Sequence, residues 1–343
     1  MTPSEAAGRT VAAVTEHDLI GRIASQLPPG PDWLVVGPGD DGAVVRHERN
    51  ALDVITTDAC VEGVHFDRRF VPPDAIGHRA LAVNLSDLAA MGAAPRLATL
   101  SLAMPGTLAL VDFDGIVGAL LALARKHDTT VVGGNLSRSP GPLVLDLTAI
   151  GMARPRRVLV RAGARPGDEV FVSGTLGAAR AGLEMCIEDP AGAHAEQDPD
   201  SPRGRYLRPE PRVRLGVMLG RNQAATACMD LSDGLADGLR QIARASHVGL
   251  AIDAEALPID PAARAWFEAR GRDPVDEAIA GGDDYELLFT VSPRRHGRLK
   301  AVTRLVRGLR LTRIGTVTRE TSLVVRRDGR SEALPAGFAH FGG

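Results

Sequence analysis

The sequence predicts a globular protein of two domains in which strands and helices alternate. Its 343 residues exceed the length of one ordinary domain, which is about 150 residues. Apolar residues make up 44% of the chain and charged residues 24%, as in soluble folded proteins. Strand and helix patterns follow one another in both halves. We expect the domains to cover residues 1–152 and 153–343, with a linker at 153–157.

The first half begins with a helix over residues 16–26, because Thr15 and Asp18 form the pattern of a capping box. Two further helices are expected over 75–91 and 115–127. Strands are predicted at 33–36, 52–55, 97–103, 130–132 and 142–150. Three of these strands lead directly into polar or glycine-rich turns.

The second half repeats this alternation. Strands are predicted at 169–172, 225–229, 249–252, 285–291 and 322–326, and helices at 176–187 and 235–245. Residues 189–205 are rich in Pro, Gly, Asp and Ala, and we expect them to form a mobile loop.

We expect neither a secretion signal nor a membrane-spanning helix in this sequence. Residues 1–14 lack the apolar core of a secretion signal, and the longest apolar run, 115–124, is shorter than the about 20 residues that a bilayer requires. Cys60, Cys186 and Cys228 are too scattered for a disulfide framework or a zinc site. We therefore expect a cytoplasmic protein.

Charge limits the classes of partner. The formal net charge of −2 gives no reason to expect a nucleic acid or an anionic membrane. Lysine occurs only at Lys126 and Lys300, so the Gly-Lys-Ser/Thr sequence of a Walker phosphate loop is absent. Any phosphate that the chain binds must be held by metal ions, arginines or backbone amides.

Aspartates cluster where predicted strands end and glycine turns begin. The members of these clusters are Asp40, Asp41, Asp58, Asp230, Asp233, Asp283 and Asp284. Asp87 differs, because it lies on an otherwise apolar helix, three residues after Asn84 and on the same face. Carboxylates are hard oxygen ligands that suit Mg²⁺ or Ca²⁺, and Mg²⁺ commonly completes its shell with substrate phosphates.

Each of these features also has a structural interpretation. Aspartate is ordinary in a glycine turn, and Asp233 could cap the helix that follows it. Asp87 could form a buried salt bridge with Arg79 or Arg96, because buried charges are usually paired. The glycines at 133–134 could mark a turn, or could let backbone amides approach an anion.

Taken together, eight motifs resemble those of the thiamine-monophosphate kinase family, in the superfamily that includes aminoimidazole ribonucleotide synthetase. They occur in family order from about residue 17 to the end of the chain. The motifs are GDDGAVV at 39–45, TTDACVEGVHF at 56–66, VNLSDLAAMGAAP at 83–95, VVGGNLSRS at 131–139, GDEVFVSGTLG at 167–177, MDLSDGL at 229–235, GGDDYELLF at 281–289 and GFAHF at 337–341. The segment 61–66 and the aromatic tail favour the kinase over its relatives.

The chain departs from the family pattern at few positions. Asp283 stands where the family often has Glu, Asn135 where many members have Asp, and Phe338 where Trp is frequent. Ala59 and Cys60 replace more usual aliphatic residues. None of these changes removes a motif carboxylate.

The resemblance implies a fold and an activity. The family fold has two α+β domains: N-terminal domains that pair in a homodimer through a shared β-barrel and bind ATP and Mg²⁺, and an α/β-type C-terminal domain that completes the active site. The implied reaction is ATP-dependent phosphorylation of thiamine monophosphate to thiamine diphosphate, with Mg²⁺.

The resemblance also assigns residues. Implied Mg²⁺ ligands are Asp41, Thr56, Thr57, Asp58, Asp87, Asn135, Asp230 and Asp233, of which Asp41, Asp87, Asp230 and Asp233 are the catalytic set. Implied ATP contacts are Gly133, Gly134, Asn135, Arg161 and Ser232, and implied thiamine contacts are Asp58, His65, Asp284 and Phe338. His65 could equally be a structural histidine, and Phe338 a core anchor for the tail.

These residue types suit a reaction between two phosphates. A phosphate monoester has a second pKa near 6, so the acceptor oxygen is mostly deprotonated at pH 7 and needs little or no general base. The obstacle is repulsion between polyanions, which metal ions bridging carboxylates and phosphates would overcome.

Other members of the superfamily provide the alternatives. Selenophosphate synthetase needs a reactive Cys or selenocysteine and a Lys near the N-terminus, but none precedes Cys60 or Lys126. The hydrogenase-maturation relative ends in a functional cysteine, whereas this chain ends at Gly343. Two alternatives stay open: an amide-activating enzyme like aminoimidazole ribonucleotide synthetase, and a nucleotide-binding sensor without turnover.

Overall fold

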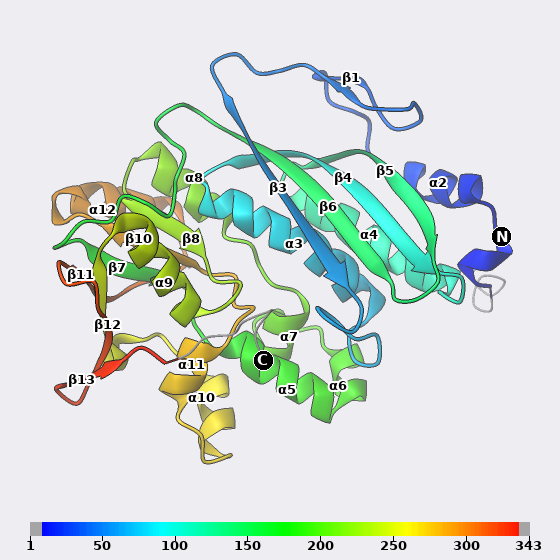
Figure 1. Ribbon diagram of the computed structural model, residues 1–343. Helices are drawn as coiled ribbons and strands as arrows, with labels where there is room; N and C mark the ends of the chain where they lie inside the picture. Colours follow the sequence, from blue (N-terminus) through cyan, green and yellow to red (C-terminus); the bar gives the residue numbers. More distant parts are fainter. Residues whose placement is uncertain (1–8, 336–343) are drawn as a thin grey trace. The chain divides into compact units, whose positions relative to one another are not determined.

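In the computed structural model, which describes residues 9–335, the chain divides into two units (Figure 1). The N-terminal unit contains the chain up to Asn84, Pro95–Met152 and the short insert Asp189–Ala195. The C-terminal unit contains Leu85–Ala94, Ala153–Glu188 and the chain from Glu196 onward. One helix, α3 (Pro73–Ala90), therefore contributes residues to both units.

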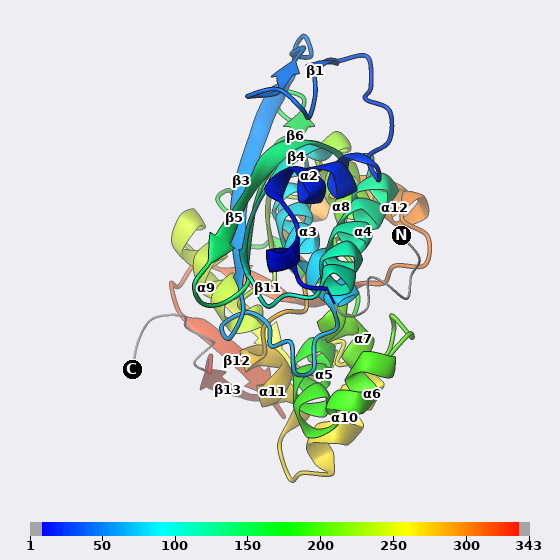
Figure 2. The ribbon, with the colours of Figure 1, turned by 90° about the vertical axis from the view of Figure 1, so that its right-hand side faces the viewer.

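A four-stranded sheet forms the centre of the N-terminal unit. Its strand order is β3 (Leu52–Val61), β6 (Val144–Ala153), β4 (Ala94–Pro105) and β5 (Thr130–Ser139). Helices α3 and α4 (Leu110–Lys126) cover one face of this sheet (Figure 2). The core side chains, such as Phe113, Ile116 and Leu102, are fully buried there.

The first helix packs against this core. A 3₁₀ turn, η1 (Val11–Ala13), precedes α2 (Glu16–Ala24), and Thr15 and Asp18 form the predicted capping box. Arg22 on α2 is paired with Asp114 on α4, with 2.6 Å between Nη1 and Oδ2. After α2, the short strands β1 (Leu34–Val36) and β2 (Val44–Val45) pair around the glycine-aspartate turn.

A seven-stranded sheet forms the centre of the C-terminal unit. Its order is β13 (Arg330–Ala333), β12 (Leu323–Arg327), β9 (Gly249–Asp253), β11 (Leu311–Thr318), β7 (Glu169–Ser173), β10 (Leu287–Val291) and β8 (Ala227–Asp230). Five of its six strand pairs are antiparallel, and β9 with β12 is parallel. A mainly antiparallel sheet with helices belongs to the α+β class.

Helices surround this sheet. They are α5 (Ala178–Glu188), α8 (Val213–Arg221), α9 (Leu235–Ser246), α10 (Pro261–Glu268), α11 (Pro274–Ala280) and α12 (His296–Leu305), with 3₁₀ turns η2 (Ala254–Ala256) and η3 (Pro293–Arg295). The apolar stripe of α9 lies in the main core and consists of Leu235, Leu239 and Ile242. Strand residues such as Val172 and Leu288 belong to the same core.

Two predictions about strand ends were wrong. Strand β3 continues to Val61, so the segment 56–58 lies within it, and β5 continues to Ser139, so 133–135 lies within that strand. The cause is pairing, because parallel β4 and β5 run side by side as far as Pro105 and Ser139. Glycine and aspartate residues predict a turn locally, but the backbone hydrogen bonds to a neighbouring strand keep these residues in the extended conformation.

The predicted loop at 189–205 contains two short helices, α6 (Pro190–Ala195) and α7 (Pro202–Leu207). Ser201 caps α7 by accepting a hydrogen bond from the backbone N–H of Gly204, and Pro202 occupies its first turn. Serine and proline, which are typical of loops, are thus also the residues with which α7 begins. Within residues 9–335, none of the helices is both long enough and apolar enough to cross a membrane.

Candidate active site

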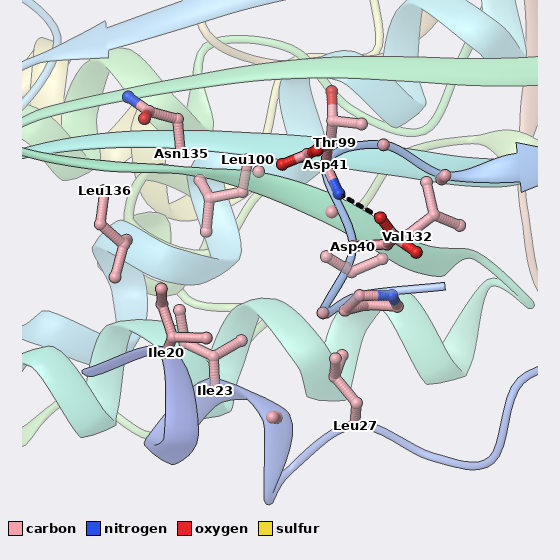
Figure 3. A pocket seen from close by; sticks show the side chains of 18 of the residues that line it. Ile20, Ile23, Leu27, Asp40, Asp41, Thr99, Leu100, Val132, Asn135 and Leu136 are labelled. Carbon is pink, nitrogen blue, oxygen red and sulfur yellow. Dashed lines mark hydrogen bonds between the residues drawn. The ribbon is translucent and has the colours of Figure 1, made fainter. Parts of the chain in front are cut away.

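The N-terminal unit contains a cavity of about 780 Å³. Four segments line it: α2, the turn at 38–43, Thr99 and Leu100 of β4, and the part of β5 at 131–136. Figure 3 shows Ile20 and Ile23 of α2 facing Leu136. The polar end of the cavity includes Asp40, whose carboxylate accepts the backbone N–H of Asp41 at 2.9 Å. The structure therefore brings together predicted site residues Asp41, Gly133, Gly134 and Asn135 around one cavity.

The two glycines of β5 have different surroundings. A Cβ atom added to Gly133 would have no heavy atom within 4 Å, so this position opens into free space. A Cβ on Gly134 would lie 2.0 Å from the carbonyl oxygen of Leu100 on β4. Gly134 thus permits the close approach of two strands, and Gly133 leaves room beside the backbone for a ligand.

Strand alternation separates the three predicted metal ligands of β3. Thr56 and Asp58 are half-buried, and Thr57 lies on the opposite, exposed face. The Thr57 hydroxyl contacts the Asp146 carboxylate at 3.2 Å and the Leu147 carbonyl at 3.1 Å. The side chain of Thr57 therefore does not lie beside that of Asp58.

His65 lies in the tight loop that follows β3. The backbone N–H of Val61 donates to its Nδ1 at 3.1 Å, and the His65 N–H donates to the Val61 carbonyl at 2.9 Å. Phe66, next to it, is 3% exposed and anchors the loop in the core. The ring is thus held by its own loop.

In the C-terminal unit, Asp230 ends β8 and is 4% exposed. The Ser86 hydroxyl of α3 donates to Asp230 Oδ2 at 2.8 Å. Burial raises the pKa of Asp230 to about 7, and the negative charge of Asp87 adds to the rise. Arg161 lies close enough to act in the opposite direction. Two predicted site residues, Asp87 and Arg161, therefore lie near enough to Asp230 to act on its charge.

Two acidic turns meet beside Asp230. Two main-chain hydrogen bonds join these turns. The Tyr285 N–H donates to the Leu231 carbonyl at 3.0 Å, and the Asp283 N–H donates to the Ser232 carbonyl at 2.7 Å. The N-cap residue of α9 is Gly234, whose φ is 89°. Asp233 therefore does not cap this helix. The turn that carries Ser232 and Asp233 is thus fixed by main-chain contacts.

Asp284 is buried and turned toward main-chain donors. Its carboxylate oxygens accept the N–H groups of Gly177 at 2.8 Å and Ala179 at 3.3 Å, at the start of α5. Burial raises the pKa of Asp284 to about 7, although these hydrogen bonds and Arg205 lower it. Its neighbour Asp283 is less buried and has a left-handed backbone, with φ of 67°. The geometry makes Asp284 an anchor for α5.

Beside it, Glu286 is fully buried between two arginines. Arg205 Nη2 lies 2.6 Å from its Oε1, and Arg212 Nε donates to its Oε2 at 2.7 Å. The Ser173 hydroxyl donates to the same Oε2 at 2.5 Å. Burial alone would raise the pKa of Glu286, but the two arginines hold it below its usual value.

The predicted Mg²⁺ ligands are divided between the two units. Asp41, the segment 56–58 and Asn135 belong to the N-terminal unit, and Asp87, Asp230 and Asp233 to the C-terminal unit. Among residues 9–335, no three acidic, histidine or cysteine side chains form a metal site by themselves. Phe338, predicted to contact thiamine, lies outside the described residues.

Two protein families match most of the chain. AIR synthase related protein, N-terminal domain, matches residues 39–153, and AIR synthase related protein, C-terminal domain, matches residues 165–328. A thiamine-monophosphate kinase from Synechococcus elongatus is 38% identical over 310 residues, covering 88% of this chain and 91% of that protein. The chain belongs to the thiamine-monophosphate kinase family.

Solved structures of thiamine-monophosphate kinases share its fold. The structure of the enzyme from Stenotrophomonas maltophilia K279a has a TM-score of 0.81 and 39% identity, covering 93% of this chain and 98% of that one. A structure of AaThiL complexed with AMPPCP and TMP has a TM-score of 0.74 and 33% identity, covering 95% and 96%. These similarities confirm the predicted two-domain α+β fold.

Several residues of this thiamine-monophosphate kinase family member were not predicted from sequence. Ser86 donates a hydrogen bond to Asp230, which lies 144 residues away in the sequence. Glu286 accepts hydrogen bonds from both Arg205 and Arg212. A polar residue next to Asp87 on an apolar helix was the available signal for Ser86. For Glu286 the signal was its place in the GGDDYELLF motif, directly before the apolar residues of β10.

Proposed function

We propose that this chain transfers the terminal phosphate of ATP to thiamine monophosphate, giving ADP and thiamine diphosphate. The observation that carries this proposal is the buried carboxylate of Asp230, which accepts the Ser86 hydroxyl and feels the negative charge of half-buried Asp87, in a chain of this family. Phosphoryl transfer depends mainly on positioning and on neutralising charge. Two close carboxylates with Arg161 nearby provide that kind of site.

ATP binds at the cavity of the N-terminal unit. Gly133 leaves its backbone open beside the cavity, and Asn135 and Asp41 line the same space. Backbone N–H groups without a covering side chain can approach phosphate oxygens closely. The apolar wall formed by Ile20 and Ile23 offers a surface for the base. Support comes from the related AaThiL, whose structure was determined with AMPPCP.

The donor set around Asp230 fits Mg²⁺. Burial and the neighbouring Asp87 both disfavour the charged form of Asp230, so a divalent cation there would relieve a real electrostatic cost. Asp41, Asp58, Asp87, Asp230 and Asp233 would hold the ions, with oxygens of Thr56, Thr57 and Asn135 completing the set. When bound, Mg²⁺ neutralises phosphate charge and orients the two substrates. Ser86 holds the Asp230 carboxylate in place for this role.

The acceptor needs no strong base from the protein. At pH 7 the phosphate of thiamine monophosphate is mostly deprotonated, because its second pKa is about 6. The chain's task is therefore to hold the acceptor oxygen in line with the terminal phosphate of ATP. Arg161 and Ser232, near Asp230, would contact the ATP phosphates during the transfer.

The thiamine contacts are proposed from the motifs of the family. His65, Asp58 and Phe338 are proposed contacts, with the aromatic ring of Phe338 stacking on the cationic thiazolium. The Asp284 carboxylate is buried and already accepts hydrogen bonds from two main-chain N–H groups. We therefore propose that its less buried neighbour Asp283, together with Asp58, provides the carboxylates that face thiamine. Asp284 acts indirectly, by fixing the turn that carries Asp283.

The working form is a homodimer in the cytoplasm. One face of β3 leaves Ile55 65% exposed, beside exposed Thr57, which suits burial against a second copy. This face supports the shared barrel that the family resemblance implies. The cysteines Cys60, Cys186 and Cys228 are buried thiols outside any disulfide, which is compatible with a reducing compartment.

The experiment incubates the purified protein with Mg²⁺, ATP and thiamine monophosphate, and follows ADP and thiamine diphosphate by chromatography. We expect the two products in equal amounts, and no reaction with free thiamine. ATP binding without product in a folded protein would reject the kinase. The amide-activating enzymes or a nucleotide sensor would then become the better interpretations.

A further inference from the structure

Three segments of the C-terminal unit contain basic residues and no acidic ones. Residues 153–167 hold five arginines, 211–229 hold three, and 287–319 hold nine arginine or lysine residues. These 17 belong to the 40 basic residues of the chain, and none of its 42 aspartate and glutamate residues lies in the three segments. The formal net charge of −2 gave no reason to expect a nucleic acid, but it does not describe this local asymmetry.

The fold brings these segments together at the end of α8. Helices α8 and α12 pack against each other (Figure 1). Arg298 Nη1 on α12 donates to the main-chain carbonyl of Gln223 at 3.2 Å, and the Gln223 side-chain amide donates to the Arg156 carbonyl at 3.5 Å. A Cβ atom on Gly220 would lie 2.3 Å from the Arg157 carbonyl oxygen, so these two main chains are in contact. The junction surface defined by these contacts carries the side chains of Arg156, Arg157, Arg221 and Arg298.

The four arginines of the junction surface are exposed. Within residues 9–335 none of them forms an ion pair with a carboxylate, and the side chain of Arg298 hydrogen-bonds only to Gln223. Arg313, in the same acid-free segment, shows the contrast, because it reaches back to Glu169 and pairs with it at 3.0 Å. A group of like charges without counter-charges is unfavourable, and a bound polyanion would offset this repulsion.

We propose that the junction surface binds the phosphate backbone of a nucleic-acid duplex, without sequence preference. Guanidinium groups stay charged and donate paired hydrogen bonds to phosphate oxygens. The three segments contain a single aromatic residue, Phe289, and it is fully buried, so they offer no ring on which an unpaired base could stack. Contacts to the backbone alone carry no sequence information. None of the four arginines has a role in the proposed kinase reaction, so this inference does not depend on it.

The same side chains disfavour a lipid bilayer and an acidic protein as the partner. Helix α12 buries Leu299 and Val302 in the fold, and of its large apolar side chains only Leu305 is exposed, so it presents no apolar face to a membrane. Protein partners are usually held by aromatic or apolar anchors at the centre of the interface, and the four arginines provide none. Positive charge and hydrogen-bond donors are what a phosphate backbone requires.

The test measures the fluorescence anisotropy of labelled DNA and RNA duplexes of about 20 base pairs as the full-length protein is added, at salt concentrations from about 50 to about 200 mM. Binding to either duplex supports the proposal if it depends on salt as phosphate contacts require. Four such contacts predict that the logarithm of the association constant falls with the logarithm of the salt concentration with a slope of about −3 to −4. The Kd near physiological salt should be roughly 1–100 μM, as for other sequence-independent binding.

Two double variants with the same loss of charge are compared. The variant with Arg221→Gln and Arg298→Gln should reduce the magnitude of the slope by about 2, one for each lost phosphate contact, and weaken binding at low salt about tenfold or more. The matched control combines Arg244→Gln and Arg330→Gln, which remove exposed arginines of α9 and β13 outside the three segments. Its affinity should stay within about twofold of the wild type, because non-contacting charges have little effect across salt.

Thermal melting of both double variants checks that they fold, and Arg156→Gln with Arg157→Gln replaces the first variant if it does not. No binding of either duplex by the wild type at low salt, or equal losses in the two double variants, would overturn the proposal. Tighter binding of a single strand than of the duplex would overturn it too, as would binding to vesicles that contain phosphatidylserine but not to nucleic acid. The kinase reaction is assayed separately, and its absence would leave these results standing.

Discussion

Gly133 and Gly134 are neighbours in β5, yet a methyl group would affect them differently. Gly133→Ala adds a Cβ in open space, so the protein should fold, while KM for ATP should rise about tenfold or more as the methyl group occupies the phosphate position. Gly134→Ala places a Cβ 2.0 Å from the Leu100 carbonyl oxygen and should cost about 1–3 kcal/mol of stability. Thermal melting and ATP kinetics of both variants check this. Equal losses of stability would contradict it.

Asp87→Asn removes one carboxylate of the pair with Asp230. Turnover should fall roughly 100-fold or more, because a charge that holds Mg²⁺ and phosphates in place is lost. Folding should be intact, because the pKa of Asp230 falls when the neighbouring negative charge is removed. Circular dichroism and initial rates test this together. An unfolded variant would favour a buried salt bridge for Asp87, and near-normal turnover would exclude both roles.

Single residues could be predicted from sequence where their type alone indicates chemistry. Asp41, Asp87 and Asp230 are acidic residues in unusual places, and the structure puts the last two side by side. Ser86 and Glu286 gain their importance from partners far along the chain, at Asp230 and Arg205. No local pattern specifies such partners, since they depend on tertiary packing.

At the scale of elements, Glu286, which directly precedes β10, pairs with Arg205 of α7 and with Arg212 at the start of α8. Glu286→Gln should destabilise the protein by about 3–5 kcal/mol, because Arg205 and Arg212 would lose the buried charge between them. The pKa of Glu286 is below its usual value, so its stabilising effect is present above the unfolded-state pKa and is lost as the pH falls through the lower folded-state pKa. Urea unfolding at neutral pH measures the loss. Glu188→Gln, at an exposed pair, should cost less than about 1 kcal/mol.

Some helices were predicted from sequence and others were not: α2 and α9 were predicted, whereas α8, α10, α11 and α12 were missed, although Asp260 and Asp273 cap α10 and α11. Helix α2 has the capping box of Thr15 and Asp18, and α9 begins at Leu235 as expected. Strands β3 and β5 were predicted too short, because their glycines and polar residues pair with a neighbouring strand that a local pattern does not show. Helix α7 was missed because its start, Ser201 and Pro202, resembles a turn.

For the whole molecule, Asp284 should make stability depend on pH. Its pKa in the folded protein is about 7, above the ordinary value of 3.8, so the folded state keeps a proton that the unfolded chain releases. Stability should therefore fall as the pH rises from about 4 to about 7, by several kcal/mol at most. Between pH 5 and pH 8 the Tm of the wild type should decrease more than that of Asp284→Asn. Identical decreases would contradict this account.

The whole-molecule architecture was predictable because eight ordered motifs span nearly the full chain, and the solved kinases confirm it. The order of strands within each sheet was not predictable. Neighbours such as β9 and β12, or β7 and β10, are far apart in sequence, so their pairing reflects packing of helices like α9 onto the sheet.

The most direct test of the central claim follows one labelled phosphate. With Mg²⁺, thiamine monophosphate and ATP labelled at the terminal phosphate, the account predicts that the label appears in thiamine diphosphate at the rate at which ADP forms. Label found only in free phosphate, or ADP formed without thiamine diphosphate, would contradict direct transfer between the two substrates.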